Sequence, residues 1–245
     1  MTENTVYIGK DLEAMSFAAN YHRWILDEFR PYLGDHIVEV GAGTGNFSRL
    51  LLAESPRKLS LVEPSEMFEH LERNISTVET RTDVSLYNSI FRYAADTIAA
   101  KARPDTIIYI NVLEHIEDDL GELQTIYQTL ADGGQCLIFV PALQALYGDF
   151  DRKVGHFRRY AKKDLEEKCR TAGFNIVRSR YFDLAGIIPW FIKYRILRSD
   201  DLSPNAVTLY DRLAVPVVKK FESLVNIPLG KNVLMVIGKG RETDC

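Results

Sequence analysis

Side chains that can transfer protons and bind anions are concentrated between residues 147 and 165, in the run YGDFDRKVGHFRRYAKKDL. His156 carries an imidazole, whose ordinary pKa of about 6.5 suits removal of a proton near neutral pH. Arg158, Arg159 and Tyr160 follow it and can bind an anionic or oxygen-rich molecule. The cluster can instead contact nucleic acid, or its arginines can pair with nearby acids. Those acids are Asp149, Asp151 and Asp164.

A second histidine, His115, lies in the sequence LEHIEDD after a predicted strand. It is a candidate for proton transfer, because imidazole titrates near neutral pH. It is also open to a structural role, since the neighbouring acids Glu114, Glu117 and Asp118 can partner it. The candidate catalytic residues are therefore His156, His115 and Tyr160.

A glycine-rich stretch, GAGTG at residues 41–45, lies between the apolar run HIVEV and the helical pattern NFSRLLLAES. This order places a tight turn at the carboxyl end of a strand, where open α/β sheets bind ligands. Glycine permits the turn and lets a ligand approach the backbone without a Cβ in the way. Glu63 ends the next predicted strand, where a carboxylate can accept hydrogen bonds from both ribose hydroxyls of a nucleoside.

The spacing of the glycines separates two kinds of nucleotide ligand. The dinucleotide fingerprint Gly-x-Gly-x-x-Gly, counted from Gly41, requires glycine at position 46, but the chain has Asn46 there and its third glycine at 45. A phosphate-binding loop requires a lysine that does not follow this stretch. Because Glu63 suits both NAD and other adenosyl ligands, a nicotinamide-dependent oxidoreductase stays an alternative.

The overall composition argues against a general nucleic-acid-binding protein. The chain of 245 residues has a formal net charge of −4, whereas such proteins are strongly basic. Its cysteines, Cys136, Cys169 and Cys245, lack the paired spacing of a zinc site, so we expect no bound metal and a reducing, cytoplasmic compartment. We see no secretory signal pattern, and the longest apolar run, GIIPWFI, is too short to cross a bilayer.

Apolar patterns of two periods alternate along the chain and predict the elements that position these residues. Runs rich in β-branched residues predict strands at 36–40, 58–64, 83–90, 105–112, 135–142, 174–182 and 232–239. Helical spacing predicts helices at 11–33, 46–55, 65–75, 120–131 and 161–173. Strands that alternate with helices indicate an α/β domain with a parallel sheet covered on both faces.

Two segments, 141–160 and 182–230, interrupt this alternation, and we expect them to form a lid and cap. The second contains YFDLAGIIPWFIKYRIL, which is too apolar for a free loop and makes Trp190 a candidate for the wall of an acceptor site. Apolar residues at helical spacing farther along predict the face by which a helix packs. They are Leu209, Leu213, Val217, Phe221 and Leu224. A membrane-surface or dimer contact is the alternative for these stretches.

Four motifs in order, VEVGAGTGNFS, LVEPSEMF, INVLEHIEDD and DGGQCLIFVPA, resemble those of the class I S-adenosylmethionine-dependent methyltransferases. The resemblance covers about residues 20–180, and the last predicted strand is similar to the antiparallel strand of that family. It implies a Rossmann-like doubly wound sheet, mostly parallel with a final antiparallel strand, in a single domain spanning residues 1–245. The subgroup that the chain most resembles is the small-molecule methyltransferases like those of ubiquinone biosynthesis.

The resemblance implies S-adenosylmethionine as the cofactor and S-adenosylhomocysteine as the product. By position in the motifs, Glu39 and the three glycines are expected to line the methionine and ribose, and Glu63 to hold the ribose hydroxyls. Met67 is expected near the adenine, and Asn88 stands where many members carry an acid. The whole expected cofactor set is Tyr21, Glu39, Gly41, Gly43, Gly45, Glu63, Met67, Asn88, Asn111 and Leu113.

Tyr21, with the nearby Trp24, is expected either to close over the methionine end of the cofactor or to pack in the core. The expected substrate-binding residues are Arg158, Arg159 and Trp190. Members that methylate exocyclic adenine amines or glutamine amides usually carry Asn/Asp-Pro-Pro-Tyr/Phe where this chain has NVLEH. We therefore expect transfer to a small molecule, with oxygen favoured as the acceptor. The alternatives are the oxidoreductase and a non-catalytic cofactor-binding protein of the same fold.

Overall fold

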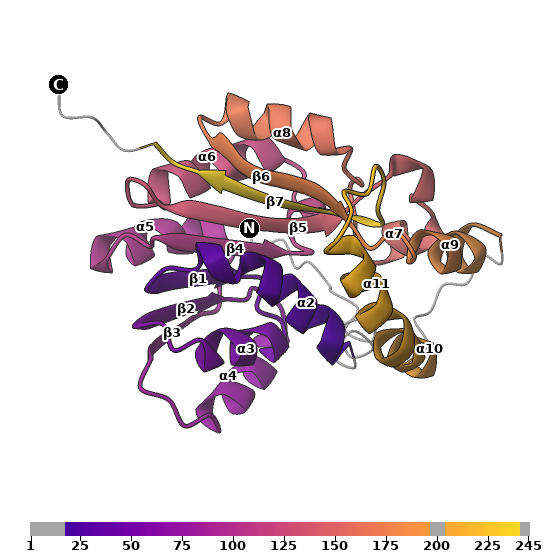
Figure 1. Ribbon diagram of the computed structural model, residues 1–245. Helices are drawn as coiled ribbons and strands as arrows, with labels where there is room; N and C mark the ends of the chain where they lie inside the picture. The colour runs from indigo at the N-terminus through magenta and orange to yellow at the C-terminus, as the bar shows by residue number, and fades with distance from the viewer. Residues whose placement is uncertain (1–17, 197–203, 241–245) are drawn as a thin grey trace.

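The computed structural model describes residues 18–196 and 204–240. A seven-stranded sheet runs through them in the order β3-β2-β1-β4-β5-β7-β6 (Figure 1). Its strands are β1 (His36–Val40), β2 (Lys58–Val62), β3 (Asp83–Tyr87), β4 (Thr106–Ile110), β5 (Gln135–Pro141), β6 (Asn175–Phe182) and β7 (Asn232–Gly238). The first five strands in this order, β3, β2, β1, β4 and β5, are parallel to one another, and β7 is antiparallel to its neighbours β5 and β6. The predicted sheet is confirmed; the start of the 11–33 helix and Cys245 lie outside the described residues.

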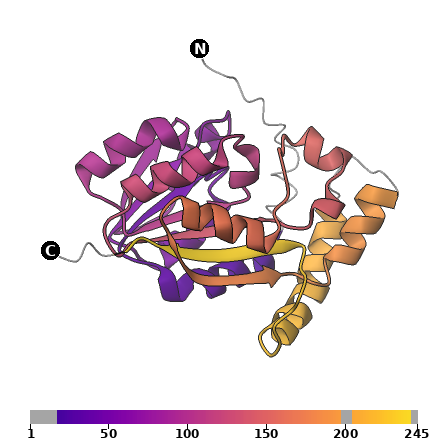
Figure 2. The same ribbon diagram turned by 90° about the horizontal axis from the view of Figure 1, so that it is seen from above.

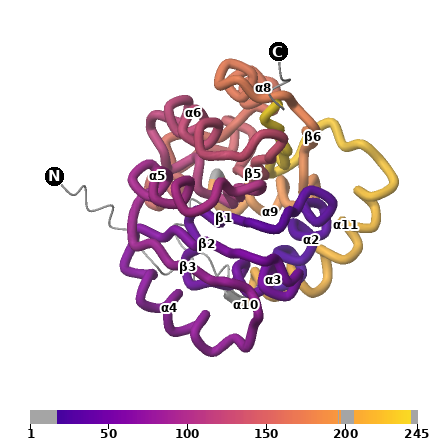
Figure 3. Tube along the Cα trace, turned by 90° about the vertical axis from the view of Figure 1, so that its left-hand side faces the viewer, coloured from indigo at the N-terminus to yellow at the C-terminus, as the bar shows by residue number. Residues whose placement is uncertain are grey.

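Helices cover both faces of the sheet, as the alternating pattern predicts (Figure 3). One face carries α2 (Ala19–Phe29), α3 (Asn46–Ala53) and α4 (Phe68–Ser76), and the other carries α5 (Phe91–Lys101), α6 (Asp119–Thr129) and α8 (Lys162–Thr171). Successive strand residues point to opposite faces, so Ile37 enters one apolar core whereas Val38 and Val40 enter the other. Both faces of β1 are therefore buried, so its three apolar residues pack into the two cores, and its two polar residues, His36 and Glu39, are buried as well.

Helix α5 is the one framework helix that the sequence analysis did not predict. Its buried residues, Phe91, Ala94, Ala95 and Ile98, do follow helical spacing. Two of the four are alanines, whose small side chains make the apolar stripe a weak signal. Only the packing of this stripe against the sheet establishes the helix as part of the core.

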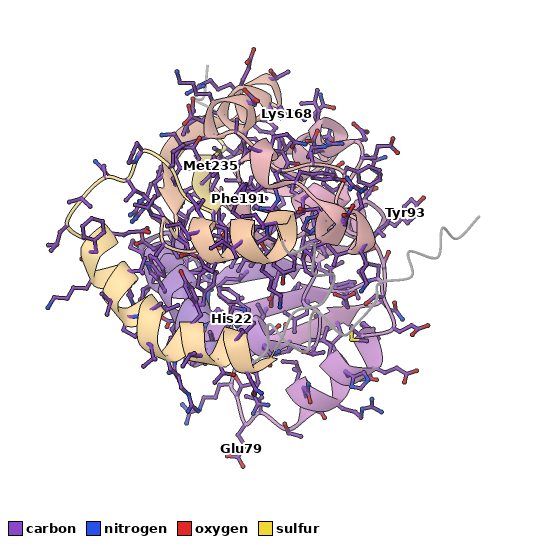
Figure 4. All side chains as sticks on the ribbon, turned by 90° about the vertical axis from the view of Figure 1, so that its right-hand side faces the viewer. His22, Glu79, Tyr93, Lys168, Phe191 and Met235 are labelled. Carbon is purple, nitrogen blue, oxygen red and sulfur yellow. The ribbon has the colours of Figure 1, made fainter. Side chains whose placement is uncertain are left out.

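The two segments outside the framework gather at the carboxyl end of the parallel strands (Figures 1 and 2). After β5 the chain forms a 3-10 turn (Gln144–Leu146) and α7 (Asp149–Lys153). Between β6 and β7 lie α9 (Ile187–Trp190), α10 (Pro204–Leu209) and α11 (Val215–Glu222), with π-helical turns at Phe191–Ile196 and Tyr210–Ala214. Figure 4 shows the helix that carries Phe191 crossing in front of the sheet. No helix in the described ranges is long and apolar enough to span a membrane.

The prediction that Leu209, Leu213, Val217, Phe221 and Leu224 form the packing side of a helix is wrong. These five residues are exposed, from 53% for Phe221 to 78% for Leu224. The helix instead packs through the opposite face, where Val215 is buried in the core beside α2. Polar groups on that face find partners: Asp211 accepts hydrogen bonds from the backbone N–H groups of Asn20 (3.0 Å) and Tyr21 (2.8 Å).

Asp183, directly after β6, ties this cap to the sheet. Its carboxylate is fully buried, pairs with the Lys231 ammonium at 2.9 Å, and accepts hydrogen bonds from the hydroxyls of Tyr21 and Tyr210. Burial alone would raise the pKa of Asp183, but Lys231, Tyr210 and the Gly186 N–H hold that pKa below its usual value. Helices α10 and α11, with the π-helical turn between them, form one continuous helix over 204–222, called the α10–α11 helix below. The Asp183 carboxylate therefore binds residues from α2, from the α10–α11 helix and from the position before β7.

Candidate active site

The glycine turn joins the end of β1 to the start of α3. Gly41, Gly43 and Gly45 have φ values of +72°, +56° and +86°, a region that residues with a Cβ rarely adopt. A Cβ on Gly41 would also lie 2.3 Å from Cγ2 of Val112, which follows β4. The turn therefore needs glycine both for its backbone conformation and for its close approach to the neighbouring strand.

Glu63 follows β2 and lies beside this turn. It is 6% exposed, and its two carboxylate oxygens accept hydrogen bonds from the backbone N–H groups of Gly43 (2.7 Å) and Ser65 (2.9 Å). Each carboxylate oxygen has two lone-pair positions, so each keeps one after these bonds. A buried carboxylate fixed in this way suits two adjacent hydroxyl donors, as the ribose of an adenosyl group presents them.

Glu39, within β1, points into the protein beneath the turn. It is 4% exposed, and one of its carboxylate oxygens accepts a hydrogen bond from the Ser48 hydroxyl at 2.5 Å. Burial raises the pKa of Glu39 to about 8, with a smaller upward contribution from Glu63 and a downward one from the Ser48 hydrogen bond. A carboxyl group in this state becomes more favourably ionised when a cation, such as an amino-acid ammonium, is placed against it.

The pKa of Glu39 predicts how stability depends on pH in the ligand-free protein. Between the ordinary pKa of 4.5 and the folded value of about 8, the folded protein retains a proton that the unfolded chain has lost. The free energy of unfolding should therefore fall as pH rises through this window, by at most about 1.4 kcal/mol per pH unit for one proton. Urea unfolding at several pH values should show a smaller slope in Glu39→Gln than in the unaltered protein, while Glu114, whose pKa is also raised to about 7, keeps its own contribution.

Glu69→Gln is the matched control, because Glu69 is exposed on α4. That variant should keep the pH dependence of the unaltered protein. An identical slope in Glu39→Gln and in the unaltered chain would contradict the assignment of the proton to Glu39.

The remaining expected cofactor residues lie at different places along the same edge. Met67 begins α4, Asn88 is exposed just after β3, and Asn111 follows β4 with a positive φ of 52°. Leu113 is fully buried in a 3-10 turn after β4. Tyr21 is a packing residue between α2 and the sheet, because its ring contacts Phe139 and Phe182 and its hydroxyl bonds to Asp183; a direct cofactor contact of Tyr21 stays a prediction.

A second group of functional side chains lies after β4 and β5. Glu114 and His115 belong to the turn after β4, and His156 follows α7, with the Phe157 N–H bonded to the Glu114 carbonyl at 2.9 Å. The imidazole rings of His115 and His156 meet edge to face at 4.6 Å between centroids. His156 Nδ1 lies 2.8 Å from Asp151 Oδ1, and its Nε2 lies 3.8 Å from Glu114 Oε1.

Burial governs the titration of this group. It raises the pKa of the Glu114 carboxyl to about 7, against the attraction of His156. It lowers the pKa of His115 to about 3, and repulsion from His156 lowers it further. His115 is therefore neutral over the whole physiological range, which weakens the case for it as the group that takes a proton.

Comparison with known proteins identifies the family of this chain and the cofactor that the family uses. The model of a family described as a methyltransferase domain matches residues 16–179. The chain belongs to the class I S-adenosylmethionine-dependent methyltransferases. S-adenosylmethionine is accordingly the cofactor of this methyltransferase.

Solved structures show the same fold at low sequence identity. A methyltransferase of Haloferax volcanii in complex with the Trm112 methyltransferase activator is 14% identical with a TM-score of 0.60, covering 96% of this chain and 95% of that one. A methyltransferase of Archaeoglobus fulgidus is 15% identical with a TM-score of 0.59 and coverages of 93% and 98%. Burkholderia thailandensis 1,6-didemethyltoxoflavin-N1-methyltransferase is 16% identical with a TM-score of 0.59 and coverages of 95% and 82%. No curated protein matched the sequence.

The other expected acceptor-side residues of the methyltransferase have partners within the protein. Arg158 pairs with Asp119 at 2.6 Å and Arg159, 5% exposed, pairs with Asp151 at 2.8 Å. The Tyr160 hydroxyl, also buried, donates to Asp119 at 2.9 Å. The sequence left open that these arginines pair with Asp149, Asp151 or Asp164. Arg159 does pair with Asp151, whereas Arg158 pairs with Asp119, which was not one of the three.

Trp190 joins the two segments outside the framework. The Arg159 guanidinium lies 4.7 Å from the centre of its ring, and Phe150 of α7 contacts the same ring edge to face. Asp151 and Glu114, which hold this side of the site together, were not expected as functional residues. The sequence indicates a functional role for Asp151 only by its position five residues before His156. The role of Glu114 is indicated only by the folded chain, where its carboxylate is buried near the His156 imidazole.

Proposed function

We propose that this methyltransferase transfers a methyl group to an oxygen of a small-molecule acceptor, by in-line displacement at the carboxyl edge of the sheet. The observation that carries the proposal is the placement of two groups of side chains at one edge. Glu63 and the glycine turn follow β2 and β1, and the His156 group follows β4 and β5. These four strands are neighbours in the sheet, so a cofactor over one pair presents its methyl group toward the other.

S-adenosylmethionine supplies an electrophilic methyl group on a sulfonium sulfur. On the cofactor side, Glu63 would accept hydrogen bonds from the ribose hydroxyls, and the backbone of Gly41, Gly43 and Gly45 would lie against the methionine and ribose. Glu39 would stabilise the cofactor's ammonium group electrostatically. Further proposed contacts are Met67, Asn88, Asn111 and Leu113.

On the acceptor side, His156 is the residue that we propose takes the proton of an acceptor hydroxyl. Asp151 is a positioning residue, because its hydrogen bond to Nδ1 orients the ring and leaves Nε2 for the proton. Oxygen is favoured because His156 can take the proton of a hydroxyl; NVLEH, where members that methylate adenine amines or glutamine amides usually carry Asn/Asp-Pro-Pro-Tyr/Phe, argues only against a nucleic-acid amine or a protein amide as the acceptor. A small acceptor agrees with the Burkholderia relative, which was solved with bound 1,6-didemethyltoxoflavin and is named for transfer to N1.

We further propose that the chain is one domain, in which segments 141–160 and 182–230 act as lid and cap over the acceptor. Trp190 contacts α7 from α9 and so connects the two segments. A cytoplasmic location is proposed from the thiols, since Cys136 and Cys169 are both free and buried.

The test has two stages. Calorimetry with S-adenosylhomocysteine should first show binding at tens of micromolar or tighter, and its absence would refute the proposed cofactor site. Incubation with S-adenosylmethionine and a panel of hydroxylated and carboxylated metabolites should then release S-adenosylhomocysteine with at least one of them. Release only with amine acceptors would refute the oxygen acceptor. Binding without release for any class of acceptor would favour the non-catalytic alternative.

A further inference from the structure

Three side chains that can ligate a metal ion converge beside the proposed acceptor site. Glu114, His115 and His156 each offer one ligand atom, and these three atoms lie within 4.8 Å of one another. They come from two segments more than 40 residues apart along the chain. A hydrogen bond from the Phe157 N–H to the Glu114 carbonyl connects the two segments.

The Glu114 carboxylate lacks hydrogen-bond donors from other residues within the described part of the chain. It is 0% exposed, and neither of its oxygens has a hydrogen-bond partner on another described residue. A buried carboxylate without a partner is costly, and such groups in native proteins point to a bound water or ion or to a catalytic role. The imidazole of His156 is near it, but its Nε2 at 3.8 Å from Glu114 Oε1 is too distant for a hydrogen bond.

Both histidines are held by a second partner, as metal-binding histidines almost always are. His156 binds Asp151 through Nδ1, which leaves Nε2 on the side of Glu114. The His115 imidazole hydrogen-bonds to the backbone of Gly155. Asp151 is itself fixed by Arg159 at 2.8 Å. The orientation of each ring is therefore determined before any ion is added.

We propose that Glu114, His115 and His156 bind one divalent transition-metal ion. Two imidazoles favour zinc, iron, copper or nickel over magnesium, calcium or manganese, which prefer oxygen ligands. Three protein ligands leave coordination positions open, as in catalytic rather than structural sites. The inference contradicts the expectation of no metal, which rested on the spacing of the cysteines alone.

The role of the ion rests on the proposed function. An ion at this place would bind the acceptor oxygen and lower its pKa, so an acceptor with a hydroxyl or a carboxylate would suit it. His156 would then be a ligand of the ion and not the proton acceptor. A carboxylate acceptor has no proton to lose, and a hydroxyl acceptor with its pKa lowered by the ion would give its proton to water.

The test measures metal directly, on the full chain without a histidine tag. The protein is stripped with a chelator, then titrated with Co²⁺ followed by its visible absorption spectrum, and with Zn²⁺ followed by elemental analysis after gel filtration. We expect one ion per chain. Glu114→Gln and His115→Ala should each weaken binding at least tenfold, since even the loss of an outer partner of a ligand costs about 10- to 100-fold.

The controls carry the same substitutions at exposed positions. Glu117→Gln and His70→Ala, both exposed, should bind metal as the unaltered chain does. Less than one ion per ten chains in the unaltered protein, or equal affinity in Glu114→Gln and Glu117→Gln, would overturn the inference. S-adenosylhomocysteine affinity should change less than twofold in all variants. Because that measurement is independent of metal content, failure of the cofactor proposal and failure of the metal site are distinguishable.

A separate observation concerns the exposed stripe on the α10–α11 helix. Leu209, Leu213, Val217, Phe221 and Leu224 lie along one side and are each more than half exposed. Soluble chains seldom leave so continuous an apolar row without a partner. The exposed charges on the same helix, among the described side chains, are basic: Arg212 and Lys220 are exposed, whereas Asp211 and Glu222 are buried.

We infer from this charge pattern that the stripe docks onto an anionic lipid surface. An apolar side flanked by lysine and arginine is typical of helices that lie in a membrane interface, and a chain of net charge −4 gains attraction to anionic lipid only through such a local bias. The helix would lie parallel to the surface, with the cap facing the lipid.

Vesicle sedimentation tests this inference. The chain should bind vesicles of phosphatidylglycerol and phosphatidylcholine (3:7) at least tenfold more tightly than vesicles of phosphatidylcholine alone. The double variant Leu213→Gln, Val217→Gln should lose at least tenfold of that affinity, whereas Val177→Gln on β6, also exposed, should keep it. Equal binding of the double variant and the control would overturn the inference. So would a dimer in sedimentation velocity that only the double variant dissociates, because a second copy would then be the partner.

Discussion

Replacing Glu63 with alanine is expected to weaken S-adenosylhomocysteine binding by about 100-fold. In the proposed site the carboxylate accepts two charge-assisted hydrogen bonds from the ribose, each contributing at least about 1.5 kcal/mol. The sum of about 3 kcal/mol corresponds to about 100-fold in affinity. The substitution also frees the N–H groups of Gly43 and Ser65, which Glu63 now binds at 2.7 and 2.9 Å, so the turn itself becomes less ordered. Isothermal titration calorimetry measures the change.

Two further variants separate the ribose contact from the ordering of the turn. Glu66→Ala removes an exposed carboxylate three residues away and should leave the affinity within twofold. Glu63→Gln loses the charge and keeps one oxygen, which can accept from only one of the two N–H groups because they bond to different carboxylate oxygens; its affinity should fall between those of the alanine variant and the unaltered chain. An unchanged affinity in Glu63→Ala would remove Glu63 from the cofactor site.

Replacing Asp183 with alanine is expected to lower the free energy of unfolding by about 3–5 kcal/mol, the usual effect of removing one partner from a buried ion pair. The variant leaves the Lys231 ammonium without its 2.9 Å partner, and it removes the acceptor of the Tyr21 and Tyr210 hydroxyls. For a chain of this size the melting temperature should fall by about 6–20 °C. Differential scanning calorimetry measures the loss.

The cap should be affected before the sheet. In Asp183→Ala, hydrogen exchange should accelerate first in α10 and α11, because Tyr210 between them loses its bond to the sheet. Asp96→Ala, an exposed position in the middle of α5, should change stability by no more than about 0.5 kcal/mol. Uniform acceleration over α5 and α11 in Asp183→Ala would contradict the anchoring role.

The framework of the sheet could be predicted from local sequence because each of its elements carries its own periodicity. HIVEV is buried on both faces between β2 and β4, and its apolar residues Ile37, Val38 and Val40 indicate this directly. The glycine turn is similarly local, since the positive φ values at Gly41, Gly43 and Gly45 are required by a short connection between adjacent elements. Contacts within a few residues decide these features, and the sequence displays them directly.

The packing of the last helix could not be predicted in this way. A helical stripe such as Leu209 to Leu224 shows which side is apolar, but burial depends on whether a partner surface lies against that side. The partner of this helix lies against its other side, where α2 supplies a backbone N–H to Asp211 and the turn after β6 supplies one to Glu222. These N–H groups come from positions far along the chain, so local periodicity contains no information about them.

The sequence by itself determined the α/β sheet, the glycine turn with Glu63 and the methyltransferase family, because these follow from short-range patterns and motifs in a set order. Only the tertiary structure decided what the histidines contact. It places His156 between Asp151 and Glu114, occupies Arg158 and Arg159 with acids, and buries the Glu114 carboxylate without a partner on another described residue. The physical reason is that burial and charge pairing between separate loops arise when the sheet brings the ends of β4 and β5 together.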